Sequence, residues 1–255
     1  MGMSLQLFKG AESVAEFDFP LSDMRDTCAE IARVQDEVGG GMVLYRVKVA
    51  TGGGKSFDVV TGDEDMDTSV QKFAGVILYS HSCNARFDED AVGNTTPVCS
   101  SIDGKVGMIA GTGVCSRCSG CPYNEFGTDR NGSGKACKNM VRLYVMTEGM
   151  PIPLLLTLPP TSIKAYKTYR TTSLASRRLT PEHVVTEFSL EQQTSAAGQK
   201  YSTVKFRLAG KLPPEQCEVA DYFAATIREA QRAAAVTGED YNREERTEVQ
   251  DAEAQ

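Results

Sequence analysis

The chain has 255 residues, of which 41% are hydrophobic and 24% charged, and its formal net charge is −7. This composition is typical of a globular protein that forms one large domain or a domain with an inserted module. No apolar run approaches the roughly 20 residues that a membrane-spanning helix needs, and the N-terminus lacks a charged segment followed by an apolar one. We therefore expect neither membrane insertion nor export.

Hydrophobic periodicity in the first third of the chain predicts one helix and three strands. In chain order these are a helix over 22–38 and strands over 42–50, 56–60 and 73–81. The sequence TGGGKS between the first two strands resembles a phosphate-binding loop. However, Val49 stands where that pattern needs glycine, and a strand rather than a helix follows, so a hairpin turn is favoured.

The apolar periodicity disappears between residues 82 and 140, where Gly, Ser, Asn and Asp take over and five cysteines cluster between residues 99 and 137. A segment this long without regular structure is unusual inside a compact domain unless something else holds it together. We therefore expect a cysteine-rich insertion that a metal ion stabilises.

Regular patterns resume after the insertion. They predict strands over 141–146 and 152–158, a helix over 161–179 that Thr161 or Ser162 caps, strands over 183–192 and 201–210, and a final helix over 213–236. The order predicts an α+β, mainly β fold: an OB-like Greek-key barrel with a zinc-binding insertion and a C-terminal helix. Residues 1–238 would form this single domain, and residues 239–255 an acidic disordered tail.

The cysteines of the insertion have the spacing of a metal site. Cys115, Cys118 and Cys121 follow at three-residue intervals, and Cys99 and Cys137 flank them. Thiols stay reduced in the cytosol, which favours metal binding over disulfides. A tetrahedral zinc site commonly uses a C-x2-C pair and two distant ligands. The expected ligands are Cys99, Cys118, Cys121 and Cys137, with Cys115 as the alternative to Cys118.

A [4Fe–4S] cluster is the alternative cofactor, because C-x2-C-x2-C followed by a distant cysteine is also found in ferredoxins. Zinc remains the favoured cofactor.

The charge of the chain is strongly asymmetric. Residues 135–178 carry eight Lys and Arg against Glu148 alone, whereas residues 239–255 carry seven acids against two arginines. Tyr and Phe repeatedly lie beside these cations, a combination that binds single-stranded nucleic acid by neutralising phosphates and stacking bases. The candidate DNA contacts are Arg46, Lys48, Arg86, Arg117, Tyr123, Lys135, Lys138, Arg142, Tyr144, Lys164, Tyr166, Lys167, Tyr169 and Arg170.

An enzyme is not indicated. The chain has two histidines, His81 and His183, and neither lies in a recognisable hydrolase, zinc-protease or deaminase motif. The remaining alternatives are a zinc-bearing protein-binding adaptor or transcription regulator and an iron–sulfur protein related to nucleases.

Three motifs between residues 75 and 175 resemble a family of bacteriophage proteins. They are CSGCPYNEFG, GKACKN and LPPTS, in that order. The family is similar to the single-stranded-DNA-binding proteins of T-even phages, which have an OB fold, a zinc-bearing subdomain and an acidic C-terminal tail. The T-even proteins bind zinc through three cysteines and one histidine, whereas four cysteines are available here.

The resemblance implies a sequence-nonspecific single-stranded-DNA-binding protein that acts in phage DNA replication and recombination, in the cytoplasm of the bacterial host. Its acidic tail would recruit replication or recombination proteins. The sequence leaves open whether DNA or RNA is preferred and which oligomer forms.

Overall fold

The computed structural model describes Arg33, Glu37 and residues 44–61, 67–88, 96–148, 150, 152–196 and 198–231. Arg33 and Glu37 are helical, and they form an ion pair. The rest of the expected helix over 22–38 lies outside the described residues, as does the acidic tail over 239–255.

The fold is mainly β with a few helices. The strands are β1 (Arg46–Val49), β2 (Phe57–Val60), β3 (Thr68–Val70), β4 (Lys72–Arg86), β5 (Cys99–Ser101), β6 (Val106–Ile109), β7 (Cys115–Arg117), β8 (Cys137–Met146), β9 (Leu154–Leu158), β10 (Val184–Thr194) and β11 (Lys200–Lys211). The helices are α2 (Pro160–Thr168) and α3 (Pro214–Gln231), with short 3-10 helices η3 (Pro122–Asn124), η5 (Ala175–Arg177) and η6 (Pro181–His183) and the π-helical turn η4 (Tyr169–Leu174).

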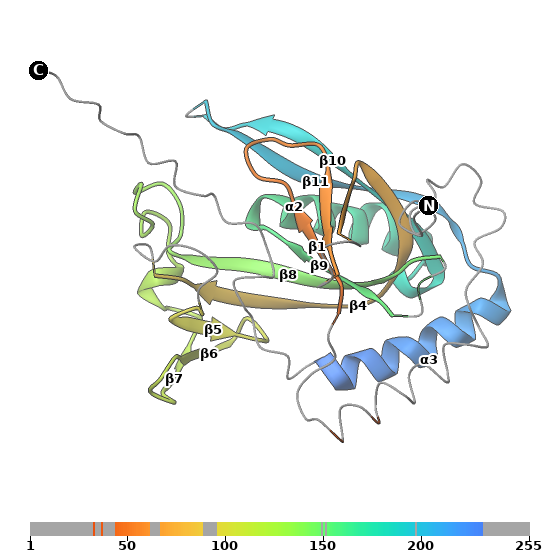
Figure 1. Ribbon diagram of the computed structural model, residues 1–255, viewed down its shortest axis with the longest axis horizontal. Helices are drawn as coiled ribbons and strands as arrows, with labels where there is room; N and C mark the ends of the chain where they lie inside the picture. Colours follow the sequence, from red (N-terminus) through yellow and green to blue (C-terminus); the bar gives the residue numbers. More distant parts are fainter. Residues whose placement is uncertain are drawn as a thin grey trace, which may run out of the picture.

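The strands form one mixed sheet in the order β3-β2-β1-β9-β8-β4-β5-β6-β7, and the β10–β11 hairpin joins it through β4 (Figure 1). All pairs are antiparallel except β1 with β9. Among the described strands the sheet has open edges at β3, β7 and β11, and the expected OB-like Greek-key barrel is not confirmed. Two side chains of the β10–β11 hairpin nevertheless contact the turn before β2: Gln192 Nε2 donates to Gly53 O at 3.0 Å, and Ser202 Oγ donates to Gly54 O at 2.8 Å.

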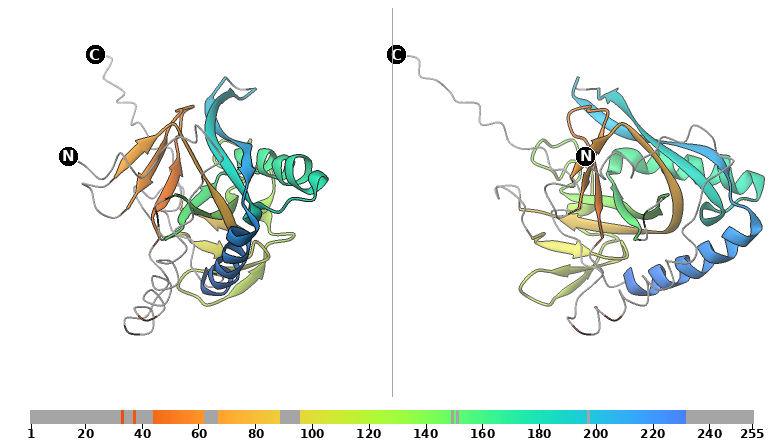
Figure 2. Two further views of the ribbon diagram at one scale, coloured as in Figure 1. Left: turned by 90° about the vertical axis from the view of Figure 1, so that its right-hand side faces the viewer. Right: turned by 45° about the vertical axis from the view of Figure 1, so that its right-hand side comes forward.

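The long strand β4 organises the sheet by pairing with three different strands. Its first four residues pair with β10, the remainder pairs with β8, and its last three residues also pair with β5. At the crossover, a Cβ atom on Gly75 would lie 2.5 Å from the carbonyl oxygen of Met146, so only glycine lets the backbones approach this closely. A β-bulge follows between Ile77 and Tyr79, and the strand curves around the core (Figure 2).

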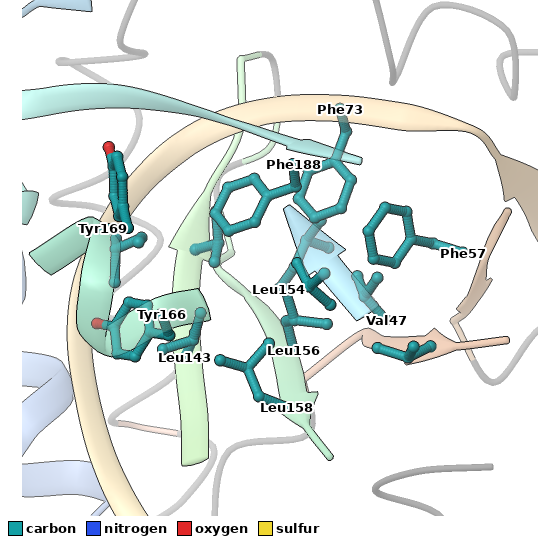
Figure 3. Close-up of a cluster of buried hydrophobic side chains, with 14 of the residues drawn as sticks. Val47, Phe57, Phe73, Leu143, Leu154, Leu156, Leu158, Tyr166, Tyr169 and Phe188 are labelled. Carbon is teal, nitrogen blue, oxygen red and sulfur yellow. The ribbon is translucent and has the colours of Figure 1, made fainter. Parts of the chain in front are cut away.

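The main core is built on aromatic contacts inside this curve (Figure 3). Phe73 packs edge-on against Phe57, with centroids 5.2 Å apart, and stacks on Phe188 at 4.7 Å. Tyr166 and Tyr169 enter the same cluster from α2 and η4. A second cluster packs α3 against the other face of β4 and β8, and a small third one holds Cys83, Ala85, Phe87 and Met140.

Helix α2 is fixed to the sheet by hydroxyl groups of its first turn. Ser162 Oγ accepts a hydrogen bond from Val204 N at 2.9 Å, and Thr161 Oγ1 donates to Ser202 O at 3.3 Å. The expected capping by Thr161 or Ser162 is wrong, because Pro159 is the N-cap residue and Pro160 starts the helix. None of the helices in the described ranges is both long and apolar enough to cross a membrane.

Candidate metal centre and nucleic-acid interface

The short strands β5, β6 and β7 continue the sheet beyond β4 and form, with the loop up to β8, a small cysteine module over residues 99–137 (Figure 1). Cys99 lies in β5 and Cys137 begins β8. Cys118 and Cys121 lie in the turn after β7, where Cys118 N donates to Lys105 O at 2.8 Å and Cys121 N to Cys118 O at 3.4 Å. This turn carries the C-x2-C pair back toward β5 and β8.

All four expected ligands line one small cavity of about 20 Å³. Its other walls are polar or small: Asn84, Ser100, Ser101, Gly107, Ser116 and Asn124. A Cβ atom on Gly107 would lie 3.0 Å from Cys99 Sγ and 3.7 Å from Cys118 Sγ, so glycine leaves the space beside the sulfurs open.

Cys115 is not part of this group. It lies in β7, where it pairs with Met108 of β6, and its side chain is exposed. Because it does not line the cavity, the structure gives no support to the alternative in which Cys115 replaces Cys118.

The thiols affect one another through their charges. Burial raises the pKa of Cys137 to about 11, and Cys118, Cys99 and Cys121 act in the same direction, whereas Arg86 lowers this pKa. Burial, followed by Cys118, also raises the pKa of Cys99. Without a metal these two thiols are therefore protonated at neutral pH, and a bound cation would have to displace their protons.

The four cysteine sulfurs are the donor set that fits a metal ion. Thiolates are preferred zinc ligands, and four of them with a C-x2-C pair make a closed structural site. In the described parts of the chain, no group of three or more His, Cys, Asp or Glu is arranged so that it could already hold a metal ion. The four sulfurs share a cavity and would have to draw together around the ion.

A chain of amide side chains links the module to the sheet. Asn124 Nδ2 donates to Cys118 O at 3.1 Å, and Lys135 Nζ donates to Asn124 Oδ1 and to Asn139 Oδ1. Asn139 Nδ2 then donates to Asn84 Oδ1 at 2.8 Å. The three asparagines were not expected as site residues, since a single Asn in a strand or turn carries no pattern.

Two aromatic rings of the module are exposed, and each has a cation over it. Arg86 Cζ lies 4.1 Å from the ring centroid of Tyr123, and Lys135 Nζ lies 5.1 Å from that of Phe126. Tyr123 is 48% exposed and Phe126 80%. Exposed aromatic rings with adjacent cations are the combination that stacks bases of a single strand.

Four expected DNA contacts are buried instead: Arg142, Tyr144, Tyr166 and Tyr169. Tyr144 stacks with Tyr79 and His81, and His81 Nε2 lies 3.1 Å from its hydroxyl. Burial, as the largest effect, lowers the pKa of His81. Tyr169 is within 2.7 Å of Thr186 Oγ1. Such side chains support the core, and we leave them out of the proposed interface.

The remaining expected cations lie in different places. Lys164 and Lys167 are exposed on α2, and Arg117 is exposed on β7. Arg46 and Lys48 of β1 are partly buried. Lys138 Nζ donates to Lys135 O, and Arg170 lies over Tyr166 and donates to its hydroxyl. Helix α2 and strands β5–β7 lie on opposite sides of the β4–β8 pair (Figures 1 and 2), so the α2 cations do not adjoin the module's rings.

Comparisons of the chain with protein-family models, with curated proteins and with solved structures find no match. The function is therefore argued from the site itself.

Proposed function

We propose that this protein binds single-stranded DNA with little sequence preference and is not an enzyme. The observation that carries the proposal is the pair of exposed rings, Tyr123 and Phe126, each with a cation over one face. A cation on one face fixes the ring and leaves ring surface available to a base, and π-faces stack every base alike. The exposed cations of α2 lie on the other side of the β4–β8 pair, and they would contact phosphates only of a strand long enough to pass around that pair.

We further propose that one zinc ion, held by Cys99, Cys118, Cys121 and Cys137, organises the module. The four cysteines that line one cavity are the complete ligand set of a structural zinc site. When bound, the zinc cross-links β5, the turn after β7 and β8, and so supplies folding free energy that a glycine-rich segment lacks. Zinc by elemental analysis, without absorbance near ~400 nm, would exclude the [4Fe–4S] alternative.

The fold proposed for this function is OB-like. Its support is the curvature of β4 and the two hydrogen bonds by which the β10–β11 hairpin reaches the β1–β2 turn. The acidic residues 239–255, outside the described part of the chain, would recruit replication or recombination proteins.

The decisive experiment is a fluorescence-anisotropy titration of labelled oligo-dT across a series of salt concentrations. We expect Tyr123→Ala and Phe126→Ala each to weaken binding by ~1–3 kcal/mol with an unchanged slope of log K against log salt. We expect Lys164→Ala and Lys167→Ala each to flatten that slope by about 0.7, because each removes one phosphate contact.

The matched control is Tyr222→Ala, since Tyr222 is 52% exposed, close to the value for Tyr123, but lies on α3. It should bind as the unmodified protein does. No binding of oligo-dT at low salt, or equal binding of a duplex of the same length, would refute the proposal.

A protein-binding adaptor is the second candidate. The observation in its favour is an exposed apolar surface on the β6–β7 hairpin, formed by Val106, Met108 and Val114, which are 48%, 58% and 54% exposed. Exposed apolar patches often mark protein contacts. The titration separates the two functions. A protein-binding adaptor should not bind oligo-dT with an affinity that falls with salt and that Tyr123→Ala weakens.

A further inference from the structure

Arg86 occupies a particular position in the sheet. It is the last residue of β4, and it is the cross-strand partner of Cys137 in β8 and also of Cys99 in β5. Directly paired residues of adjacent strands project from the same face of a sheet. The side chain of Arg86 therefore emerges between two of the four cysteines that line the cavity.

The same side chain reaches an exposed ring. Its guanidinium carbon lies 4.1 Å from the ring centroid of Tyr123. Tyr123 is the second residue after Cys121, within the 3-10 turn η3, and Asn124 N donates to Cys121 O at 2.9 Å. The ring is thus held by the turn that carries one cysteine and by an arginine that stands between two others.

A metal in this cavity would create a strong local charge. Four thiolates around one divalent ion carry a net charge of about −2. Negative charge that is partly removed from water requires a nearby cation or hydrogen-bond donors. The guanidinium group of Arg86 can supply this cation, since Arg86 is paired directly with Cys99 and with Cys137.

We propose that Arg86 is a positioning residue shared by the metal centre and the Tyr123 ring, and not a phosphate contact. It offsets the charge of the four-thiolate centre and at the same time holds the ring for stacking, so that metal occupancy and DNA binding are coupled through one side chain. This inference rests on the proposed function and changes the role expected for Arg86 from the sequence.

Arg86→Met tests the inference, because methionine keeps an unbranched apolar side chain but removes the charge and the planar group. Arg86→Lys keeps the charge and removes the planar stack. Arg130→Met is the matched control, since it removes an exposed arginine from the same module away from the cysteine strands. Zinc retention is measured by competition with a chromophoric chelator, and oligo-dT binding by anisotropy across salt.

We expect Arg86→Met to hold zinc about tenfold less tightly than both the unmodified protein and Arg130→Met, as is typical when a group that supports metal ligands is lost. Arg86→Lys should retain zinc within about threefold, and both Arg86 variants should bind oligo-dT at least about fivefold more weakly with an unchanged salt slope. If Arg86→Met holds zinc as tightly as Arg130→Met, or if its salt slope flattens by about 0.7, the inference is wrong.

The zinc measurement does not depend on DNA binding. If the unmodified protein fails to bind oligo-dT while Arg86→Met still loses zinc, the proposed function fails and the role of Arg86 at the metal centre stands. If the unmodified protein contains no zinc, the inference falls whatever the DNA titration shows.

Discussion

Arg142 and Tyr144 illustrate how burial decides the role of a residue. In β8 they alternate with Val141, Leu143 and Val145, which in an exposed sheet would place them on the solvent side. Here one face of β8 lies against the main core and the other against α3 and its neighbours. An alternating pattern cannot show that both faces are covered, so the sequence suggested an interface where the structure has a core.

For the cysteines, spacing reduced the candidates to five, and the four favoured ones share a cavity in the structure. A C-x2-C pair restricts the geometry of its turn, and metal chemistry restricts the partners. The exclusion of Cys115 could not be predicted from spacing, since Cys115–Cys118 is an equally good pair. It depends on β7, which places Cys115 opposite Met108 on the exposed hairpin.

At this scale we expect Cys137→Ser to lose zinc and to loosen the module, because a serine hydroxyl is a poor zinc ligand and Cys137 joins the module to β8. Cys115→Ser is the control and should retain one zinc per chain. Elemental analysis gives the zinc content, and the rate of proteolysis within 99–137 reports loosening. Full zinc content in Cys137→Ser would show that the ligand assignment is wrong.

The elements of the chain were predicted unequally well. The strands of the second half and helix α3 occur near their expected positions, because their periodicity is sustained. The helix expected over 161–179 is only partly confirmed, since α2 ends at Thr168 and the π-helical turn η4 and the 3-10 helix η5 follow it. Strand β4 instead runs five residues past its expected end at His81, to Arg86, and β8 begins four residues earlier than expected, at Cys137. In both extensions, pairing with a neighbouring strand maintains a structure that the polar sequences SCNAR and CKNM do not indicate.

Strands β5, β6 and β7 could not be predicted, since each has only three or four residues. The pairing of β5 with β4 joins residues such as Asn84 and Ser101 that are far apart in the sequence, and local patterns do not encode such contacts. The curvature of β4 likewise could not be predicted, because the close approach at Gly75 and the bulge beside Tyr79 depend on the neighbouring strand β8.

The attachment of α2 to β11 gives a prediction at the scale of elements. Ser162 is fully buried and its Oγ accepts from Val204 N at 2.9 Å. Ser162→Ala leaves that buried amide without an acceptor, so we expect the free energy of unfolding to fall by ~1–3 kcal/mol. Thr161→Ala is the control, because the longer bond of Thr161 lies at the exposed end of the helix and its loss should cost less than about 1 kcal/mol. Urea unfolding measures both, and equal losses would contradict this account.

The whole molecule is electrically polarised. Residues 135–178 carry a large excess of Lys and Arg. They include the cations of helix α2 and Lys135 beside the Phe126 ring, which belong to the proposed interface. Residues 239–255 carry seven acids against two arginines. Opposite charges on one chain attract at a strength that falls as salt screens them, over a Debye length of about 10 Å at 0.1 M. We therefore propose that the acidic segment competes with DNA phosphates for the same cations.

Deletion of residues 239–255 should accordingly tighten binding of oligo-dT, by severalfold at low salt and by little above about 0.3 M, because screening removes the competition. The matched control keeps the segment at full length and replaces its Asp and Glu by Asn and Gln. If charge is the cause, this variant should bind as tightly as the deletion, whereas an effect of chain length would leave it unchanged. An affinity that deletion does not alter at any salt concentration would rule out competition, and the acidic residues would then act only in recruiting other proteins.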